Sequence, residues 1–377
     1  MSGIYLDYNA STPLDPKVAE TMRALLDGPF GNPSSGHWAS ASAKAIIEKA
    51  RAQVAALLGA DPAGIVFTSG GSEANNMALK GSYFALRDKG DHIVTQATEH
   101  PAILAPLRFL ERLGARVTVL PVDGEGLIDP DAVRRAITPR TVLVTIMHAN
   151  NETGAIQPVE AVAAIAREHG IRFHTDAAQS VGKIATRVDD LGVDLLTVAG
   201  HKLYAPKGVG ALYIRGGTPL EPLIHGAGHE GGRRAGTESV LLAAALGEAA
   251  ALAADLEPQN HVRALRDRFW QKLKALFGEG IALNGPEDRR LPNTLNVAFV
   301  GRVGAEVLAG LEGVAASTGS ACHAGRVELS PVLAAMGVSE HVGMGAVRFS
   351  LGRHTTAEEI DAVVDRLSRL RAGPLRQ

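Results

Sequence analysis

The fold is decided by residues 172–214, which read RFHTDAAQSVGKIATRVDDLGVDLLTVAGHKLYAPKGVGALYI. This stretch contains three candidate strands of five residues, at 172–176, 195–199 and 210–214, of which the last two are mostly apolar. Runs of this length and composition favour strands buried in a sheet. The first run ends at Asp176, and Lys202 follows shortly after the second. Because ligands in open α/β sheets bind at the carboxyl ends of strands, the stretch predicts a binding site built from neighbouring strands.

The same pattern of strand and helix continues toward the N-terminus. Further strands are predicted at 65–68, 92–95, 116–120 and 142–148. Amphipathic helices fit beside and between them, at 38–58, 73–87, 102–113 and 159–168. Strands that alternate with helices in this way are typical of an α/β domain with a mostly parallel sheet.

A change of pattern divides the chain. A long helical stretch is predicted from about 238 to 276, and after it the elements become shorter and more mixed, with strands at 296–300, 315–318 and 346–350. The 377 residues are also many for one compact core. We therefore predict a large α/β domain over 12–256. Residues 1–11 and 257–377 would form a smaller α+β domain that carries the segment around Cys322.

Composition excludes several functional classes. Lys and Arg total 38 and Asp and Glu total 40, so the balanced charge gives no reason to expect a nucleic-acid or anionic-membrane surface. The first residues, MSGIYLDYNA, lack the basic and apolar regions of a signal peptide, and no apolar run reaches the length of a membrane span. We expect a cytoplasmic enzyme that binds neither nucleic acid nor membrane.

The first candidate binding element at a strand end is the glycine pair in TSGGSEANN. Gly70 and Gly71 follow a strand, and Ser72 opens the next helix. Backbone N–H groups at a helix start form an anion site, to which a serine adds its hydroxyl. The alternative is a glycine turn with a serine cap. The segment lacks the Gly-Lys-Ser/Thr of a nucleotide-binding P-loop.

Asp176 and Lys202 together suggest a specific cofactor. A protonated pyridine ring needs a fixed anionic partner, which pyridoxal phosphate (PLP) enzymes supply as an Asp. The lysine that holds PLP must be partly desolvated, because only the neutral amine is nucleophilic. The alternatives are a helix-capping carboxylate and a solvated lysine, and Lys207 in a Pro-Lys-Gly turn is the competing amine. His100, in TEHPA, follows another strand and could stack on the ring and shuttle protons.

Cys322 is the only cysteine, so it can form neither an internal disulfide nor a multi-cysteine zinc site, and we predict no metal. It lies in STGSACHAGRVELSP, which is predicted to be an exposed, flexible loop. His323 and Arg326 nearby would favour the reactive thiolate over a buried, inert thiol. The GAGHEG stretch at 226–231 matches a dinucleotide-binding pattern but lacks the strand–helix context that pattern requires.

Several motifs in a fixed order resemble the NifS/IscS class of cysteine desulfurases, within the class-V aminotransferase family of fold-type I PLP enzymes. They are SGGSEANN, TEHPA, HANNETG, HTDAAQSVGK, GHKLYAPKGVGALY, GHEGGRRAGTES, TGSAC and RFSLGR, and the resemblance covers nearly the whole chain. It implies removal of sulfur from L-cysteine to give L-alanine and a Cys322 persulfide. It also implies transfer of that sulfur to an acceptor protein, for example in iron–sulfur cluster assembly.

The resemblance implies a role for each matching residue. Lys202 would hold PLP covalently, Asp176 would pair with the pyridine nitrogen, and His100 would stack on the ring and take the substrate thiol proton. Asn151 and Gln179 would bond the phenolic oxygen, while Gly71, Ser72 and His201 would hold the phosphate. Thr237 would reach the phosphate of a neighbouring subunit, which implies a homodimer. Arg353 would clamp the substrate carboxylate, with Asn151 nearby.

The same scaffold leaves other activities open. Ala199 stands where many relatives have a serine that bonds the phosphate, so one contact is absent. The Cys-His and Ser-Pro-Val-Leu pattern after Gly319 is also similar to selenocysteine lyases. A PLP transaminase or lyase that does not use Cys322, and a non-catalytic PLP-binding or sulfur-relay protein, are the remaining alternatives.

Overall fold

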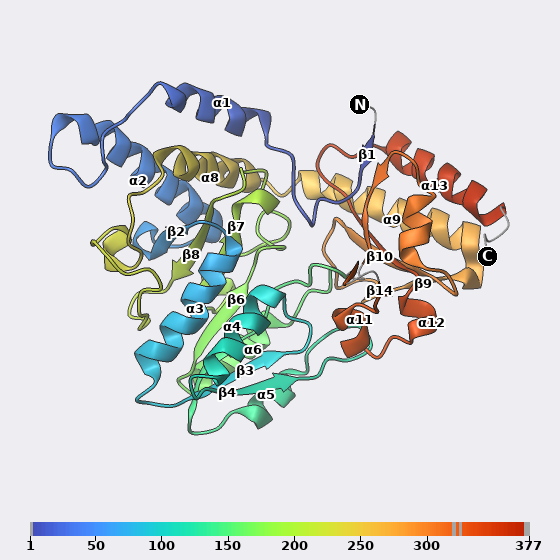
Figure 1. Ribbon diagram of the computed structural model, residues 1–377, viewed down its shortest axis with the longest axis horizontal. Coiled ribbons are helices and arrows are strands. Elements are labelled where there is room, and N and C mark those ends of the chain that lie inside the picture. The colour runs from blue at the N-terminus through green and yellow to red at the C-terminus, as the bar shows by residue number, and fades with distance from the viewer. Residues whose placement is uncertain (1–2, 319–321, 324–325, 373–377) are drawn as a thin grey trace.

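The computed structural model describes residues 3–318, 322–323 and 326–372, with the backbone alone for 322–323, 326–327 and 371–372. The chain forms two bodies side by side, and both ends of the chain lie at the smaller one (Figure 1). In the part of the chain described here, no helix is both long and apolar enough to cross a bilayer.

A seven-stranded sheet forms the centre of the larger body. Its strands, in spatial order, are β2 (Ile65–Thr68), β8 (Gly210–Ile214), β7 (Leu195–Ala199), β6 (Arg172–Asp176), β5 (Thr141–Thr145), β3 (His92–Gln96) and β4 (Arg116–Leu120). Only β8 runs antiparallel to its neighbours, so the predicted mostly parallel α/β sheet is confirmed.

Helices surround this sheet (Figure 1). They are α1 (Pro16–Leu26), α2 (Trp38–Leu58), α3 (Gly71–Leu86), α4 (Pro101–Glu111), α5 (Pro130–Ala136), α6 (Val159–Glu168), α7 (Val188–Leu191) and α8 (Val240–Ala253). Some pack against the strands, and others, such as α1 on α8, pack on neighbouring helices. The largest core cluster of this body gathers residues between Val18 and Ala253.

The smaller body has its own antiparallel sheet, in the order β12 (Ser317–Thr318), β15 (Ala346–Ser350), β10 (Thr294–Phe299) and β9 (Ile281–Leu283). Around it lie α9 (Pro258–Phe277), α10 (Gly304–Ala309), α11 (Pro331–Ala335), α12 (Glu340–Gly343) and α13 (Ala357–Ala372). A parallel pair, β1 (Ile4–Tyr5) with β11 (Val314–Ala315), attaches the N-terminus.

The second core joins Ile4 and Leu6 to residues between Val262 and Leu367. The N-terminal segment therefore packs with the C-terminal third of the chain. This grouping supports the proposed division into 12–256 and 1–11 with 257–377, which stays a prediction.

The structure corrects two local predictions. The helix predicted from 238 to 276 is interrupted between Ala253 and Pro258, because proline has no backbone N–H and suits the first turn of a new helix. Cys322, predicted to lie in a loop, belongs to β13 (Cys322–His323), which pairs antiparallel with β14 (Arg326–Val327).

Candidate active site

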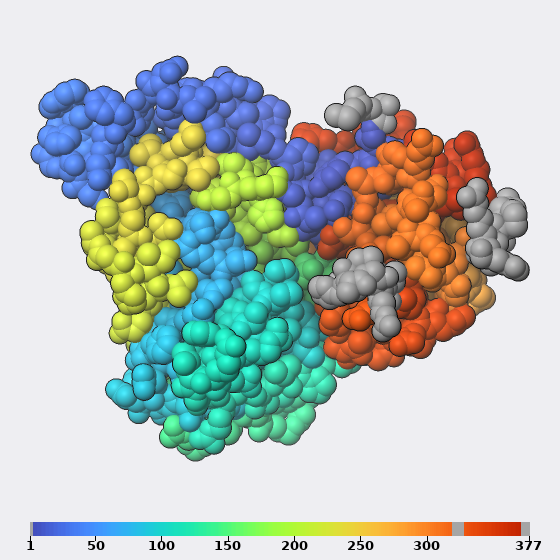
Figure 2. Space-filling model, viewed as in Figure 1, coloured from blue at the N-terminus to red at the C-terminus, as the bar shows by residue number. Residues whose placement is uncertain are grey.

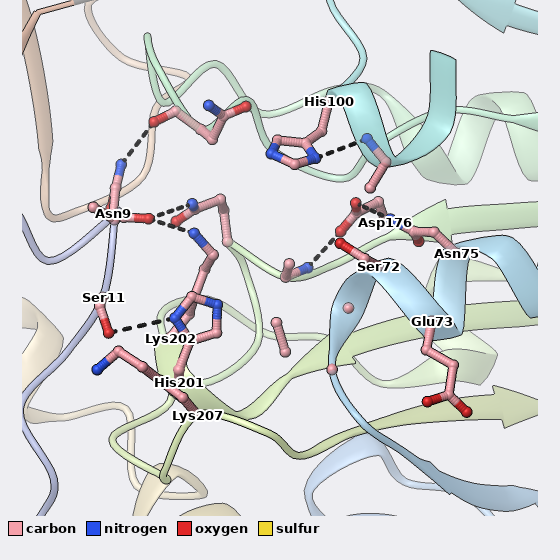
Figure 3. A pocket seen from close by; sticks show the side chains of 18 of the residues that line it. Asn9, Ser11, Ser72, Glu73, Asn75, His100, Asp176, His201, Lys202 and Lys207 are labelled. Carbon is pink, nitrogen blue, oxygen red and sulfur yellow. Dashed lines mark hydrogen bonds between the residues drawn. The ribbon is translucent and has the colours of Figure 1, made fainter. Parts of the chain in front are cut away.

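A cavity of about 690 Å³ lies at the carboxyl ends of the large sheet's strands. Eight of the residues to which a site role was assigned line it: Gly71, Ser72, His100, Asn151, Asp176, Gln179, His201 and Lys202. They come from segments up to 131 positions apart, since Lys202 minus Gly71 spans that distance in the chain. The sheet thus brings the predicted polar strand ends together (Figure 3).

Lys202 lies in a short 3-10 turn, Gly200–Lys202, directly after β7. Its Nζ donates a hydrogen bond of 2.5 Å to the backbone carbonyl of Asn9. Burial, followed by the positive charge of Arg348, lowers the pKa of Lys202 to about 8, although Asp176 opposes the shift. The amine is therefore far more often neutral near pH 7 than an ordinary lysine.

Asp176 is the last residue of β6, and its carboxylate is fixed by two donors. Asn75 Nδ2, from α3, donates to it at 2.6 Å, and the backbone N–H of Ala178 donates at 2.9 Å. The carboxylate lies on the cavity wall, between the start of α3 and His100 (Figure 3). A buried carboxylate held in this way suits a partner that is a protonated ring nitrogen.

His100 is the N-cap of α4, and its Nδ1 accepts the backbone N–H of Ala102 at 3.0 Å. A nitrogen that accepts a hydrogen bond carries no proton, so the neutral ring holds its proton on Nε2. Burial lowers the pKa of His100, which Asp176 opposes and Lys202 reinforces. The ring is thus neutral near pH 7 and is prepared to donate from Nε2.

The anion end of the cavity is the start of α3. Gly70 precedes the helix with φ of 150°, a region that favours glycine, and Gly71 is the first helical residue. A Cβ added at Gly71 would lie 3.2 Å from the Cβ of Ala199, so the helix start packs closely against β7. Ser72 and His201 complete this end, where free backbone N–H groups favour a phosphate.

Taken together, the donor set fits PLP. An amine of lowered pKa, a fixed carboxylate and a helix N-terminus match the aldehyde, ring nitrogen and phosphate of that cofactor. Gln179 and Asn151 lie on the cavity wall between these groups. Among the described residues, no cluster of three or more His, Cys, Asp or Glu side chains could hold a metal ion.

The prediction for Arg353 is wrong. Its Nη1 pairs with Asp15 at 2.9 Å, and its guanidinium stacks 3.8 Å from the ring centroid of Tyr204. Arg353 and Tyr204 line a small neighbouring cavity that shares Lys202 with the main one, and Arg353 is not on the wall of the main cavity. Arg353 therefore does not face the cavity in which the cofactor and substrate would lie.

The arginine on the main cavity is Arg348, five residues earlier on β15. Its Nη2 pairs with Asp7 at 2.8 Å, and its Nη1 donates to the carbonyl of Asn151 at 2.9 Å. Its Nε is buried and has no partner among the described protein groups. Arg348 is the arginine among the residues that line the main cavity, so its guanidinium is the group placed to pair with an incoming carboxylate.

Two further predicted residues lie outside the main cavity as described. Thr237 is exposed and lines a neighbouring cavity of about 240 Å³, which shares Ser69, Gly208 and Val209 with the main one. The side chain of Cys322 lies outside the described residues, although its backbone belongs to β13.

Sequence reasoning also missed Asn9, which contacts several residues of the site. Asn9 lines the cavity, and its backbone carbonyl accepts from both Lys202 Nζ and Gln179 Nε2, the latter at 3.0 Å. It arrives from the N-terminal segment, so neither a strand end nor a reactive side chain marked it. The N-terminal stretch YLDYNASTP contains Asn9 but carries no pattern that marks it as part of a site.

Comparison with known proteins agrees with this geometry. The family model of class-V aminotransferases matches residues 4–363. The chain is 48% identical to the cysteine desulfurase IscS of Dictyoglomus turgidum over 97% of this chain and 94% of that protein. For the IscS of Mannheimia succiniciproducens the identity is 46%, over 96% and 91%.

Solved structures give the same result. A NifS-like protein superposes with a TM-score of 0.92 at 36% identity, covering 98% of this chain and 99% of that one. SspA in complex with cysteine superposes with a TM-score of 0.84 at 39% identity, covering 94% and 100%. The chain therefore belongs to the class-V aminotransferase family, among the NifS/IscS-class cysteine desulfurases.

Proposed function

We propose that this chain removes sulfur from L-cysteine with the help of PLP, leaving L-alanine, and that Cys322 receives the sulfur as a persulfide. The observation that carries the proposal is the single cavity that combines Lys202, Asp176, His100 and Arg348 with the start of α3. Each of these groups matches one part of a cofactor–amino-acid pair, and family membership points the same way.

The cofactor would be held at both its ends. Lys202 would bind its aldehyde, Asp176 its ring nitrogen, and Gly71 with Ser72 and His201 its phosphate. Asn151 and Gln179 would bond the phenolic oxygen, and the ring of His100 would stack on the pyridine. When bound, PLP supplies an electron sink for the charge that develops at the substrate's α-carbon.

Arg348 would bind the substrate carboxylate, because it is the arginine on the wall of the cavity that also holds Lys202 and Asp176. The Lys202 amine, once free, takes the proton from the α-carbon, which its lowered pKa permits near neutral pH. His100 enters with its proton on Nε2, so it can donate that proton to the substrate. Uptake of the thiol proton by the same ring would require its Nδ1 contact with Ala102 to open.

The sulfur step balances without an external oxidant. The Cys322 thiolate attacks the substrate sulfur, so an S–S bond forms as the carbon–sulfur bond breaks and its electron pair stays with the carbon skeleton. Protonation of that skeleton gives alanine, and the enzyme keeps one additional sulfur on Cys322. A thiol of an acceptor protein would then take the sulfur, with iron–sulfur cluster assembly as the process served.

We also propose a homodimer with shared active sites, in the cytoplasm. Thr237 lines the smaller cavity beside the main one, open to a residue or ligand from a second subunit. The α1–α2 corner projects from the larger body (Figure 2), and there Phe30 is 86% and Trp38 is 84% exposed. Large apolar side chains exposed at a projecting corner favour burial against a partner.

The test is to incubate the PLP-loaded protein with cysteine or selenocysteine and to measure alanine and the mass of the Cys322 peptide. The wild type should form alanine from cysteine and gain one reducible sulfur on Cys322. Lys202→Ala should form no alanine, whereas Lys207→Ala should still attach PLP covalently.

The Cys322→Ala variant separates the rival functions. Loss of desulfuration of cysteine, with the cofactor's absorbance still responding to cysteine, supports the proposal. Undiminished sulfur release from this variant would refute Cys322 as acceptor. Alanine from selenocysteine alone would make the enzyme a selenocysteine lyase.

A further inference from the structure

The segment that contains Cys322 is held at both ends by hydroxyl groups that donate to carboxylates. Before it, Ser317 Oγ donates to Asp7 Oδ1 at 2.9 Å. After it, Ser330 Oγ donates to Glu152 Oε2 at 2.6 Å. The two acceptors lie 310 and 178 positions away from their donors in the chain, so both contacts are tertiary.

Both carboxylates lead to the wall of the main cavity. Asp7 Oδ1 also accepts from Arg348 Nη2, and Arg348 Nη1 donates to the carbonyl of Asn151, the residue directly before Glu152. Arg348 and Asn151 line the cavity. Hydrogen bonds, together with the peptide bond from Asn151 to Glu152, therefore form one continuous path. It runs through Ser317, Asp7, Arg348, Asn151, Glu152 and Ser330.

The Ser330 contact is directional. Its oxygen accepts the backbone N–H groups of Val332 at 3.1 Å and Leu333 at 3.4 Å, which caps α11. A hydroxyl has a single proton, and with both acceptor positions used that proton points to Glu152. Ser330 is only 1% exposed, so water cannot replace the carboxylate.

The Ser317 contact is fixed by the backbone as well. In the register of β12 with β15, Ser317 pairs directly with Arg348. Arg348 is 8% exposed and shares Asp7 with Ser317. The first end of the segment thus lies next to the arginine that would bind the substrate carboxylate.

We propose that Asp7 and Glu152 are positioning residues for the sulfur transfer, which fix the two ends of the Cys322 segment at the rim of the cofactor cavity. The inference rests on the proposed role of Cys322 as sulfur acceptor. Cys322 lies five residues after Ser317 and eight before Ser330, so the two anchors limit where its backbone can lie. A nucleophile displaced by about 1 Å can lose on the order of 100-fold in rate.

Glu152 gives the cleaner test, because Asp7 also pairs with Arg348. We would compare Glu152→Ala and Ser330→Ala with Glu152→Gln, whose amide oxygen can still accept from Ser330. Glu160→Ala removes the same charge at an exposed position of α6 and is the matched control. All variants are loaded with PLP and mixed with cysteine. The cofactor's absorbance change reports substrate binding, and mass spectrometry reports persulfide on Cys322.

Glu152→Ala and Ser330→Ala should slow persulfide formation by at least about tenfold. The cysteine concentration that gives half of the absorbance change should stay within about twofold of the wild type, and Glu152→Gln should recover most of the rate. The proposal would be overturned if Glu152→Ala and Ser330→Ala both formed the persulfide at the wild-type rate. It would also be overturned if both variants lost the cofactor's absorbance. A wild type that never forms the persulfide would instead refute Cys322 as acceptor.

Discussion

The lowered pKa of Lys202 predicts how fast the cofactor-free protein attaches PLP at each pH. Only the neutral amine reacts with an aldehyde, so the attachment rate should follow the neutral fraction of Lys202. Burial and the charge of Arg348 lower that pKa from the usual 10.5 to about 8. The rate should therefore rise with pH and level off above a midpoint near 8.

The size of the effect follows from these two values. At pH 7.5 a lysine of pKa about 8 is roughly one-quarter neutral, against about one part in a thousand for an ordinary lysine. Lys202 should thus react roughly 200-fold faster at this pH than it would with an ordinary pKa, for the same intrinsic reactivity.

Arg348 supplies the perturbation. Arg348→Gln removes a positive charge that lowers the pKa of Lys202, so the midpoint should move to higher pH and attachment at pH 7.5 should slow. Arg348→Lys keeps a charge near the same place and should keep the midpoint closer to that of the wild type.

The assay is stopped-flow absorbance of PLP mixed with cofactor-free protein between pH 6.5 and 10, followed by borohydride reduction and mapping of the labelled peptide. Lys202→Ala, which should show no labelled site in this peptide, is the blank. A wild-type rate still rising steeply at pH 10, or a midpoint that moves down in Arg348→Gln, would refute the electrostatic account.

Three further expectations can be checked separately. Arg348→Lys should raise the KM for cysteine at least about tenfold, because a bidentate donor is lost, while Arg353→Lys should change it far less; steady-state alanine formation measures both. Glu230→Gln should lower the free energy of unfolding by about 3–5 kcal/mol, because it breaks the buried ion pair with Arg51 at 2.7 Å. Calorimetry should show a lower melting temperature, and an unchanged one would mean that the pair contributes nothing. Trp38→Glu should shift sedimentation toward the monomer if the α1–α2 corner is the dimer contact.

The large sheet was predictable because several of its strands are short apolar runs that alternate with amphipathic helices. The runs at 65–68 and 195–199 have every residue buried, as a sheet covered on both faces requires. The direction of β8 was not predictable in the same way. Its five residues resemble those of the parallel strands in composition. Only the short connection after β7 reverses the direction of the chain.

The smaller body was harder to predict, because its strands are short and pair across long stretches of sequence. β12 has two residues and depends on β15, nearly 30 positions later, for its partner. The same limit explains the wrong arginine. Arg348 and Arg353 both lie in RFSLGR. The sequence does not show that Arg348 lines the cavity from β15, whereas Arg353 pairs with Asp15.

The site itself was predictable where its residues follow strands and unpredictable where they arrive from the other body. Asp176, His100 and Lys202 were found because parallel strands end at one edge of the sheet. Asn9 belongs to the segment that packs with the smaller body, yet its carbonyl accepts from Lys202 and Gln179. Its side chain also bonds groups of the smaller body, Asn293 at 2.9 Å and Thr294 at 2.8 Å.

Asn9 therefore couples the two bodies at the reactive amine. The position of Lys202 depends on a carbonyl that the smaller body holds, and the same body carries Arg348 and the Cys322 segment. A shift of the smaller body would therefore move three groups together. They are the Asn9 carbonyl bonded to Lys202, the Arg348 side chain that would bind the substrate carboxylate, and the residues that hold the Cys322 segment. Proton removal by Lys202, substrate binding by Arg348 and sulfur transfer by Cys322 would then depend on the position of the same segment. Lys202, Arg348 and Ser317 are all hydrogen-bonded to the chain between Asp7 and Asn9, and Ser317 also pairs with β15.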